Sequence, residues 1–278
     1  MAMRQEGGRH MTGYQRSVLV VVPTLGERPE TLSSALASVR DQDGVSVHLV
    51  VVVPEHAAAA RMTALEHGAT VVDDPRCGLS GAVNAGVAAR TDEHYYAWLG
   101  DDDLLTPGGL LALCRLIESD PVSVVAFGAC GYIDEAGRQV AVSRAGGLAT
   151  FLLPWGPDLV PQPASLTRMD ALLAAGPYDE SLRFAMDLDM FLRLRRRGSF
   201  VSTRQVVASF RWHADSLTVA NRSKSLAESE AVKHRYLPGV VRPLAPLWDV
   251  PIRIATRLAA RQVNARARRV AALETVRD

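Results

Sequence analysis

The chain has 278 residues, a formal net charge of +1 and 48% hydrophobic residues. Such an apolar fraction is enough to bury a substantial core in one large or two small domains, which excludes a disordered polypeptide. A charge this close to zero gives no global reason to expect nucleic acid or an acidic protein as a partner. The composition therefore indicates a globular protein.

Cysteines and apolar runs bear on the cellular compartment. Cys77, Cys114 and Cys130 are an odd number at spacings that match neither a disulfide framework nor a zinc site. No apolar run approaches the roughly 20 residues that span a bilayer, and the start, MAMRQEGGRH, contains no hydrophobic segment for export. We therefore expect a cytoplasmic protein, with residues 1–16 as a mobile N-terminal arm.

Beyond this arm the sequence alternates between strand-like and helix-like segments. SVLVVV (17–22) is a short β-branched run, and PETLSSALASVRDQ, after a Pro/Gly turn, has apolar residues at helical spacing. The further expected strands are VHLVVVV, ATVVD, HYYAWLG and VSVVAFGA, and the further expected helices are residues 57–67, SGAVNAGVAAR and GGLLALCRLIES. Strands that are apolar on both faces and separated by helices predict an α/β fold, with a mostly parallel sheet covered on both sides.

Three adjacent carboxylates, Asp101, Asp102 and Asp103, directly follow the fourth expected strand. Ligands bind at the carboxyl ends of the strands in such sheets, so these residues are expected at the binding edge. Adjacent carboxylates repel one another and need water, a basic side chain or a cation nearby. They could be solvated turn residues that cap the next helix, but three exceed what capping requires. Hard carboxylates with open coordination sites suit Mg²⁺ or Mn²⁺ bridging to phosphate.

Five segments resemble family 2 glycosyltransferases in their order and approximate separation. They are VVVPTLGERPETLSSALASV, GLSGAVNAGVAA, WLGDDDLLTP, AGPYDESLRFAMDLDMFLRL and FRWHADSLT, which cover about 17–220. The resemblance implies a GT-A fold, a Rossmann-like, mostly parallel sheet flanked by helices. It implies an inverting enzyme that moves a sugar from a nucleoside-diphosphate carrier to an acceptor hydroxyl, using Mn²⁺ or Mg²⁺ and a carboxylate base.

The resemblance also implies a division of the chain. The expected parts are a catalytic domain at 17–222, with a nucleotide-binding half at 17–130 and an acceptor half at 131–222, and a helical C-terminal extension at 223–278.

Donor binding is expected from the loops that follow the first strands. The expected donor contacts are Pro23, Thr24, Leu25, Glu27 and Asn84, with Glu55 and Asp101 offered in place of the family carboxylates that this chain lacks near Val53 and at Gly100. The first loop, PTLGERPE, is also an ordinary strand-to-helix turn with a proline early in the helix, and both uses can hold together. Asn84, with Gly78 and Gly81, either contacts the donor or lets the helix approach the sheet closely.

The metal ligands implied by the resemblance are Asp102, which matches the last Asp of the family motif, and Asp103. A cation there would stabilise the negative charge that develops on the diphosphate leaving group. His213 is given a supporting role near the metal or diphosphate, although a lone His is more often a hydrogen-bonded structural residue.

On the acceptor side, Asp187 matches the family's general base and opens an expected helix. Gln162, Arg168 and Asp189 are expected to contact the acceptor. Without the resemblance, the favoured interpretation is that Asp187 and Asp189 complement the helix dipole, or that one of them pairs with Arg193. Gln162 and Arg168 could instead be loop and packing residues.

Four positions depart from the family pattern: Val53, Val83, Gly100 and Met186. They leave the nucleotide base and the sugar unassigned, and the acceptor could be a sugar, a lipid-linked molecule or a small molecule. They also keep a catalytically weak or inactive nucleotide-sugar-binding relative as the alternative. A metal-dependent nucleotidyltransferase is a weaker option, since the first loop is not basic and Gly-rich.

The extension after residue 237 mixes apolar residues with many arginines. It could form a basic amphipathic helix on an anionic membrane, at the inner face, where a lipid-linked acceptor would reside. It could instead pack on the catalytic domain or on a second subunit of a homo-oligomer. Alanine-rich faces bind lipid poorly, which favours packing.

Overall fold

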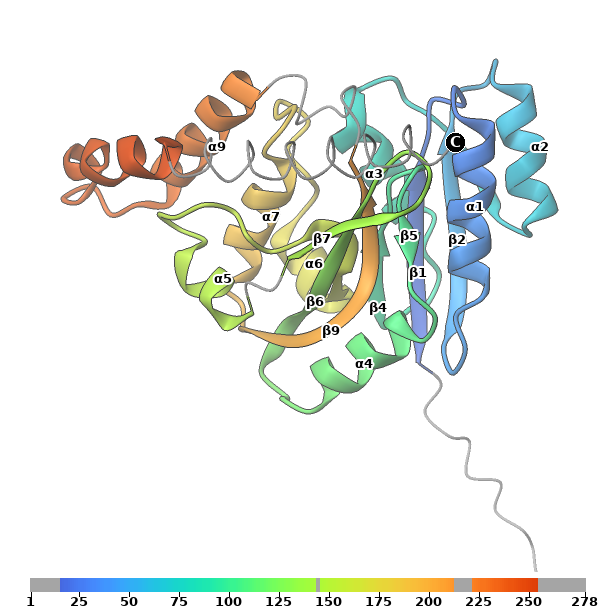
Figure 1. Ribbon diagram of the computed structural model, residues 1–278, viewed down its shortest axis with the longest axis horizontal. Helices are drawn as coiled ribbons and strands as arrows, with labels where there is room; N and C mark the ends of the chain where they lie inside the picture. Colours follow the sequence, from blue (N-terminus) through green and yellow to red (C-terminus); the bar gives the residue numbers. More distant parts are fainter. Residues whose placement is uncertain (1–15, 144–145, 213–221, 255–278) are drawn as a thin grey trace, which may run out of the picture.

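The computed structural model describes residues 16–143, 146–212 and 222–254. Within these ranges a nine-stranded sheet has the order β3-β2-β1-β4-β8-β6-β9-β5, with β7 beside β6 (Figure 1). The strands are β1 (Ser17–Pro23), β2 (Ser46–Val53), β3 (Thr70–Asp73), β4 (Tyr95–Trp98), β5 (Leu104–Leu105), β6 (Ser123–Ile133), β7 (Gln139–Ser143), β8 (Ser165–Arg168) and β9 (Ser199–Arg211).

Helices cover the faces of this sheet, and further helical segments follow its last strand in the sequence. They are α1 (Pro29–Arg40), α2 (Ala58–Glu66), α3 (Gly78–Ala88), α4 (Gly109–Glu118), α5 (Gly147–Leu152), α6 (Met169–Ala175), α7 (Met186–Leu194) and α9 (Arg222–Tyr236), with 3-10 turns η1 (Gln162–Ala164) and η2 (Arg242–Leu244). The predicted α/β architecture is confirmed.

The first four strands pair in parallel, with β1 in the centre between β2 and β4. The short strand β8 then lies antiparallel between β4 and β6, and β9 runs parallel to β6. The sheet is therefore continuous across the predicted donor and acceptor halves. Their predicted boundary, at residue 130, falls inside β6.

Strand β1 shows why the parallel strands are apolar throughout. Val18, Val20 and Val22 pack into the core cluster that includes α1, α2 and α4. Leu19 and Val21 face the opposite way, into the cluster that includes α3, α6 and α7. Both faces of the strand are buried, so its apolar pattern does not alternate. The helices on the two faces are visible in Figure 1.

The C-terminal extension is described as far as residue 254. Helix α9 packs on α7, and residues 246–254 are helical. No helix in the described ranges combines the length and the hydropathy needed to cross a bilayer. Residues 255–278, and residues 1–15 of the predicted arm, lie outside the described residues.

Gly86 sets how closely α3 approaches β1, because a Cβ added there would lie 2.3 Å from Val21 Cγ1. We expect Gly86→Ala to lower the free energy of unfolding by about 1–3 kcal/mol through overpacking, although alanine favours helix. Gly147→Ala is the matched control, since its added Cβ meets nothing within 4 Å. It should leave stability unchanged or raise it by up to about 1 kcal/mol. Urea unfolding measures both, and equal stability of Gly86→Ala and wild type would contradict the close contact.

Candidate active site

The loops after β1 and β4 meet at the carboxyl edge of the sheet. Val21 lies opposite Trp98 in the β1–β4 pair, so the residues three further along each chain are also neighbours. Those residues are Thr24 and Asp101, and Thr24 Oγ1 donates a hydrogen bond of 2.6 Å to Asp101 Oδ2. The Gly26 amide in turn donates to Thr24 Oγ1 at 2.9 Å. Two residues predicted to bind the donor are thus brought together.

Arg28, which the sequence did not single out, lies against the acidic residues. Its guanidinium forms an ion pair with Asp102 and approaches Asp101 Oδ1 at 3.7 Å. Burial raises the pKa of Asp101, and the charge of Asp102 raises it further, while Thr24 and Arg28 oppose the shift. The two carboxylates therefore repel each other electrostatically, and a nearby positive charge stabilises their ionised forms.

The carboxylate oxygens of Asp101 and Asp102 are ligands of the kind that hard divalent cations prefer. Asp101 and Asp102 are partly exposed and offer hard oxygen ligands. In the described ranges, no three His, Cys, Asp or Glu side chains gather as a metal-binding group. Mg²⁺ is commonly held by one or two carboxylates together with water and substrate phosphates, so a pair suffices. His213, the other predicted ligand, lies outside the described residues.

Asp103 faces the interior, unlike its two neighbours. It is 4% exposed, and its Oδ1 accepts a hydrogen bond of 2.9 Å from the Arg211 amide on β9. Burial, together with the charge of Asp102, raises the pKa of Asp103 to about 8. The Asp103 carboxylate thus points inward against β9, whereas Asp101 and Asp102 are partly exposed. Asp103 joins the acidic turn to β9, where Arg211 Nε also donates to the Asp102 carbonyl at 3.0 Å.

Gly100, one of the four departures from the family pattern, lies close against the aspartates that follow it. A Cβ there would lie 2.9 Å from Asp103 Oδ2 and 3.2 Å from Asp102 Oδ1. The other departures, Val53, Val83 and Met186, are at most 1% exposed and belong to the core. At these three positions an apolar side chain packs inside the protein.

Asp187 reaches the same edge of the sheet from the first turn of α7. Trp98, three residues before Asp101, donates from Nε1 to Asp187 Oδ1 at 3.0 Å. Gln162 Nε2 donates to the Trp98 carbonyl at 2.6 Å, so this predicted acceptor residue also lies at the end of β4. The sequence did not single out Trp98. Its signal was an indole N–H at the end of a buried strand, which normally needs a hydrogen-bond partner.

The pKa of Asp187 is raised to about 7, because the surrounding protein desolvates the carboxylate. The Trp98 hydrogen bond opposes this shift, and the charge of Asp158 adds to it. The side chain is nevertheless partly exposed. A carboxyl group that titrates near neutral pH and remains accessible is suited to accept a proton from a substrate.

Helix α9 holds the start of α7. Glu228 Oε1 accepts hydrogen bonds from three successive amides, those of Arg183 at 3.0 Å, Phe184 at 2.7 Å and Ala185 at 2.8 Å. These amides precede the first turn of α7 and have no partners within that helix. Glu228 thereby fixes the helix end from which Asp187 projects.

Asp189 does not face the site, contrary to the prediction that it contacts the acceptor. It is 4% exposed, and its Oδ2 pairs with Arg193 at 2.9 Å. The Tyr236 hydroxyl donates to Asp189 Oδ1 at 2.6 Å. Because α7 turns by about 100° per residue, Asp187 and Asp189 point to different sides of it. Asp189 joins α7 to α9.

Arg168 and Asn84 also serve internal contacts. Arg168 lies opposite Tyr95, the first residue of β4, and is therefore at the far end of that strand from Asp101. Its guanidinium donates to the carbonyls of Ser123 at 2.6 Å and Ile117 at 3.1 Å, so the structure does not place Arg168 at the acceptor side.

Asn84 exchanges hydrogen bonds with Tyr178. Its Nδ2 donates to the Tyr178 carbonyl at 3.0 Å, and its Oδ1 accepts from the Tyr178 amide at 2.8 Å. These bonds tie α3 to the segment before α7. Of the other predicted donor contacts, Pro23 is buried in β1, whereas Leu25, Glu27 and Glu55 are exposed on loops.

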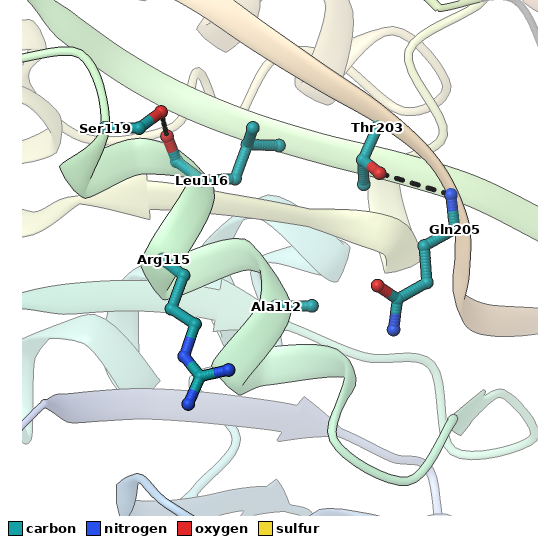
Figure 2. A pocket seen from close by; sticks show the side chains of 6 residues that line it. All are labelled: Ala112, Arg115, Leu116, Ser119, Thr203 and Gln205. Atoms are coloured by element: carbon teal, nitrogen blue, oxygen red, sulfur yellow. Dashed lines mark hydrogen bonds between the residues drawn. The ribbon is translucent and has the colours of Figure 1, made fainter.

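A hollow between α4 and β9 has a different character (Figure 2). It is lined by Ala112, Arg115, Leu116, Ser119, Thr203 and Gln205. Arg115 is the one ionisable residue among these six, and the Thr203 and Ser119 hydroxyls are engaged with nearby backbone. The hollow therefore offers no carboxylate for acid–base or metal chemistry.

Comparison with known protein families identifies the chain. The sequence model described as "Glycosyl transferase family 2" matches residues 19–174, which include Thr24, Arg28, the three aspartates and Gln162. The chain belongs to glycosyl transferase family 2. No curated protein sequence matches it significantly.

Solved structures share the fold of this family 2 chain at low identity. The mannosyltransferase PcManGT from Pyrobaculum calidifontis, in complex with GDP-Man and Mn²⁺, has a TM-score of 0.63 and 19% identity, over 94% of this chain and 81% of that one. S. aureus TarS 1-349, in complex with UDP-GlcNAc, has a TM-score of 0.62 and 13% identity, over 82% and 70%. Against the longer TarS chain, the match covers 42% of that protein.

A third similar structure is glucosyl-3-phosphoglycerate synthase from Mycobacterium tuberculosis, in complex with Mn²⁺, UDP and glucosyl-3-phosphoglycerate. It has a TM-score of 0.54 and 18% identity, over 79% of this chain and 78% of that one. At these identities the likeness establishes a shared GT-A fold.

Replacing Glu228 tests the clamp on α7. Glu228→Ala leaves three amides without their acceptor, and we expect the free energy of unfolding to fall by about 2–3 kcal/mol. Glu228→Gln keeps an oxygen acceptor without its charge and should lose about half as much. Glu66→Ala, at an exposed glutamate on α2, is the control and should change little. Urea unfolding measures all three, and no loss in Glu228→Ala would contradict the clamp.

Proposed function

We propose that this family 2 chain transfers a sugar from a nucleoside-diphosphate carrier to an acceptor hydroxyl, with inversion at the anomeric carbon. The hydrogen bond from Trp98 to Asp187 carries the proposal, since it brings an accessible carboxylate of raised pKa to the strand end that bears the acidic pair. Nucleotide sugars in the complexes of the similar PcManGT and TarS structures support it.

On the donor side, Asp101 and Asp102 would hold Mn²⁺ or Mg²⁺ through their carboxylate oxygens. The bound cation would stabilise negative charge on the departing diphosphate as a Lewis acid. Thr24 orients Asp101 through its short hydrogen bond. Arg28 supplies positive charge at the same place, and we assign its guanidinium to the donor phosphates.

On the acceptor side, Asp187 acts as the general base. The acceptor oxygen forms a bond to the anomeric carbon, while the bond from that carbon to the diphosphate breaks and its electron pair leaves with the diphosphate. The hydroxyl proton passes to Asp187, late in the displacement, when the hydroxyl has become acidic. Trp98 holds Oδ1 of the carboxylate, which leaves Oδ2 for the proton. A single displacement of this kind inverts the configuration.

Incubation with a panel of nucleotide sugars tests the function. We expect slow hydrolysis of one donor, with water in the place of the acceptor, and a loss of about 10²-fold or more in Asp187→Asn, since a positioned base contributes this much. Asp43→Asn, at an exposed aspartate remote from the acidic pair in sequence, is the control. Donor binding without turnover, even when acceptors are supplied, would favour the inactive relative.

The same reaction has an expected pH dependence. Asp187 is a base when deprotonated, and its pKa is about 7. The rate should therefore rise about tenfold per unit at low pH and level off above the pKa. A rate that stays constant through neutral pH in wild type would argue against Asp187 as the base.

Calorimetry separates the roles of the aspartates. If Asp101 and Asp102 hold the cation, Mn²⁺ should raise the affinity for nucleoside diphosphates strongly in wild type. Asp102→Asn should abolish the increase, because it removes a charged ligand. Asp103→Asn should retain it, because that side chain is buried against Arg211. Equal affinity with a chelator present, or equal losses in the two variants, would contradict the assignment.

A further inference from the structure

Residues 238–254, here called the C-terminal arm, expose a row of apolar side chains. These side chains are between 51% and 86% exposed, and they belong to Val240, Leu244, Leu247, Val250 and Ile254. Leu247, Val250 and Ile254 lie on one side of the helical residues 246–254, and Val240 and Leu244 precede them in a turn and a 3-10 turn. Isolated apolar residues on a surface are ordinary, but a continuous row marks an interaction face.

Two charged side chains of the arm form ion pairs with α9. Asp249 is 8% exposed and pairs with His234 of α9, its Oδ2 lying 2.8 Å from Nε2. Arg253 forms a bidentate ion pair with Glu230 of α9, at 2.6 and 3.0 Å. The ion pairs to α9 hold the arm with its apolar face outward.

Positive charge lies beside this face. Arg242 is exposed within the arm, and Arg195, Arg196 and Arg197 are exposed after α7. The Arg196 guanidinium lies 5.0 Å from the ring centre of Tyr236, four residues before the arm's first exposed valine. The sequence that follows the arm is basic as well, with Arg257, Arg261, Arg266, Arg268, Arg269 and Arg277 against Glu274 and Asp278.

We propose that the C-terminal arm binds the surface of a membrane that contains anionic lipids. An apolar face inserts among the acyl chains at the interface, while flanking arginines pair with the headgroups. The exposed side chains of the arm are leucine, valine, isoleucine, proline and Arg242, with no alanine among them, so the weak lipid affinity of alanine-rich faces does not apply to it. Figure 1 shows the arm in red at the end of the molecule, beyond α9 and away from α1 and α2.

Charge argues for lipid rather than for a second copy of the chain. A two-fold contact through the arm would bring the same surface of both copies together. Arginines around one arm would then meet arginines around the other, and like charges in contact repel. An anionic membrane instead supplies the opposite charge. The proposal is independent of the reaction assigned to Asp187.

Sedimentation with vesicles tests the proposal on the full chain. Vesicles of phosphatidylcholine alone are compared with vesicles that contain about one-third phosphatidylglycerol. We expect binding to the anionic vesicles, at least about tenfold tighter than to the neutral ones, and weaker binding at high salt.

Variants locate the surface. Leu247→Ser with Val250→Ser should lower vesicle partitioning about tenfold or more, because it removes two inserted side chains. Arg195→Gln with Arg197→Gln should weaken binding to anionic vesicles by about fivefold per arginine. The matched control is Met62→Ser with Leu65→Ser on α2, which are 57% and 56% exposed and should have no effect. Unchanged circular dichroism and melting temperature would show that each variant folds.

Three outcomes would overturn the proposal. One is equal sedimentation of wild type and the Leu247→Ser, Val250→Ser variant with anionic vesicles. Another is equal binding to neutral and anionic vesicles. The third is absence of vesicle binding together with a dimer in light scattering that the same double variant dissociates, which would identify the arm as a subunit interface.

Discussion

The hydrogen bond between Trp98 and Asp187 joins the end of a central strand to a helix that lies 89 residues further along the chain. Each end of this bond is held independently. Strand β4 is fixed between β1 and β8, and the start of α7 is fixed by Glu228. The bond therefore connects two rigid supports, which is the condition for placing a reactive carboxylate with precision on a scaffold. The proposed donor and acceptor sides meet at this point.

Electrostatics at this edge follow from the same packing. Burial raises the pKa values of Asp101, Asp103 and Asp187, so each carboxyl group is harder to ionise than in water. The protein keeps Arg28 beside the exposed pair and a backbone amide of β9 against the buried residue. Because these carboxylates are desolvated and repel one another, the edge favours cationic ligands. The same desolvation brings the pKa of Asp187 near neutral pH, where the carboxylate can act as a base.

Much of the fold could be predicted from the sequence, because strands that are buried on both faces are apolar throughout. The helices between them instead have apolar residues that recur every three or four positions. The position of Asp101 and Asp102 followed from that pattern. The sequence could not distinguish Asp103 from its neighbours, since only the approach of β9 brings the Arg211 amide to it. Arg168 was misplaced because β8 runs antiparallel to β4, so its last residue lies at the opposite edge. Nothing in one sequence fixed that direction.

The sheet that carries the site is hydrogen-bonded without interruption from β3 to β5 in the described part of the chain. Two lobes joined by a flexible linker can close around a ligand by a hinge motion. Here such a motion would break the hydrogen bonds that pair β8 with β4 and with β6. Any movement that accompanies substrate binding is therefore expected in the short segments that follow the strand ends. The rate of product release would then depend on how fast those segments reorder, while the framework beneath them stays fixed.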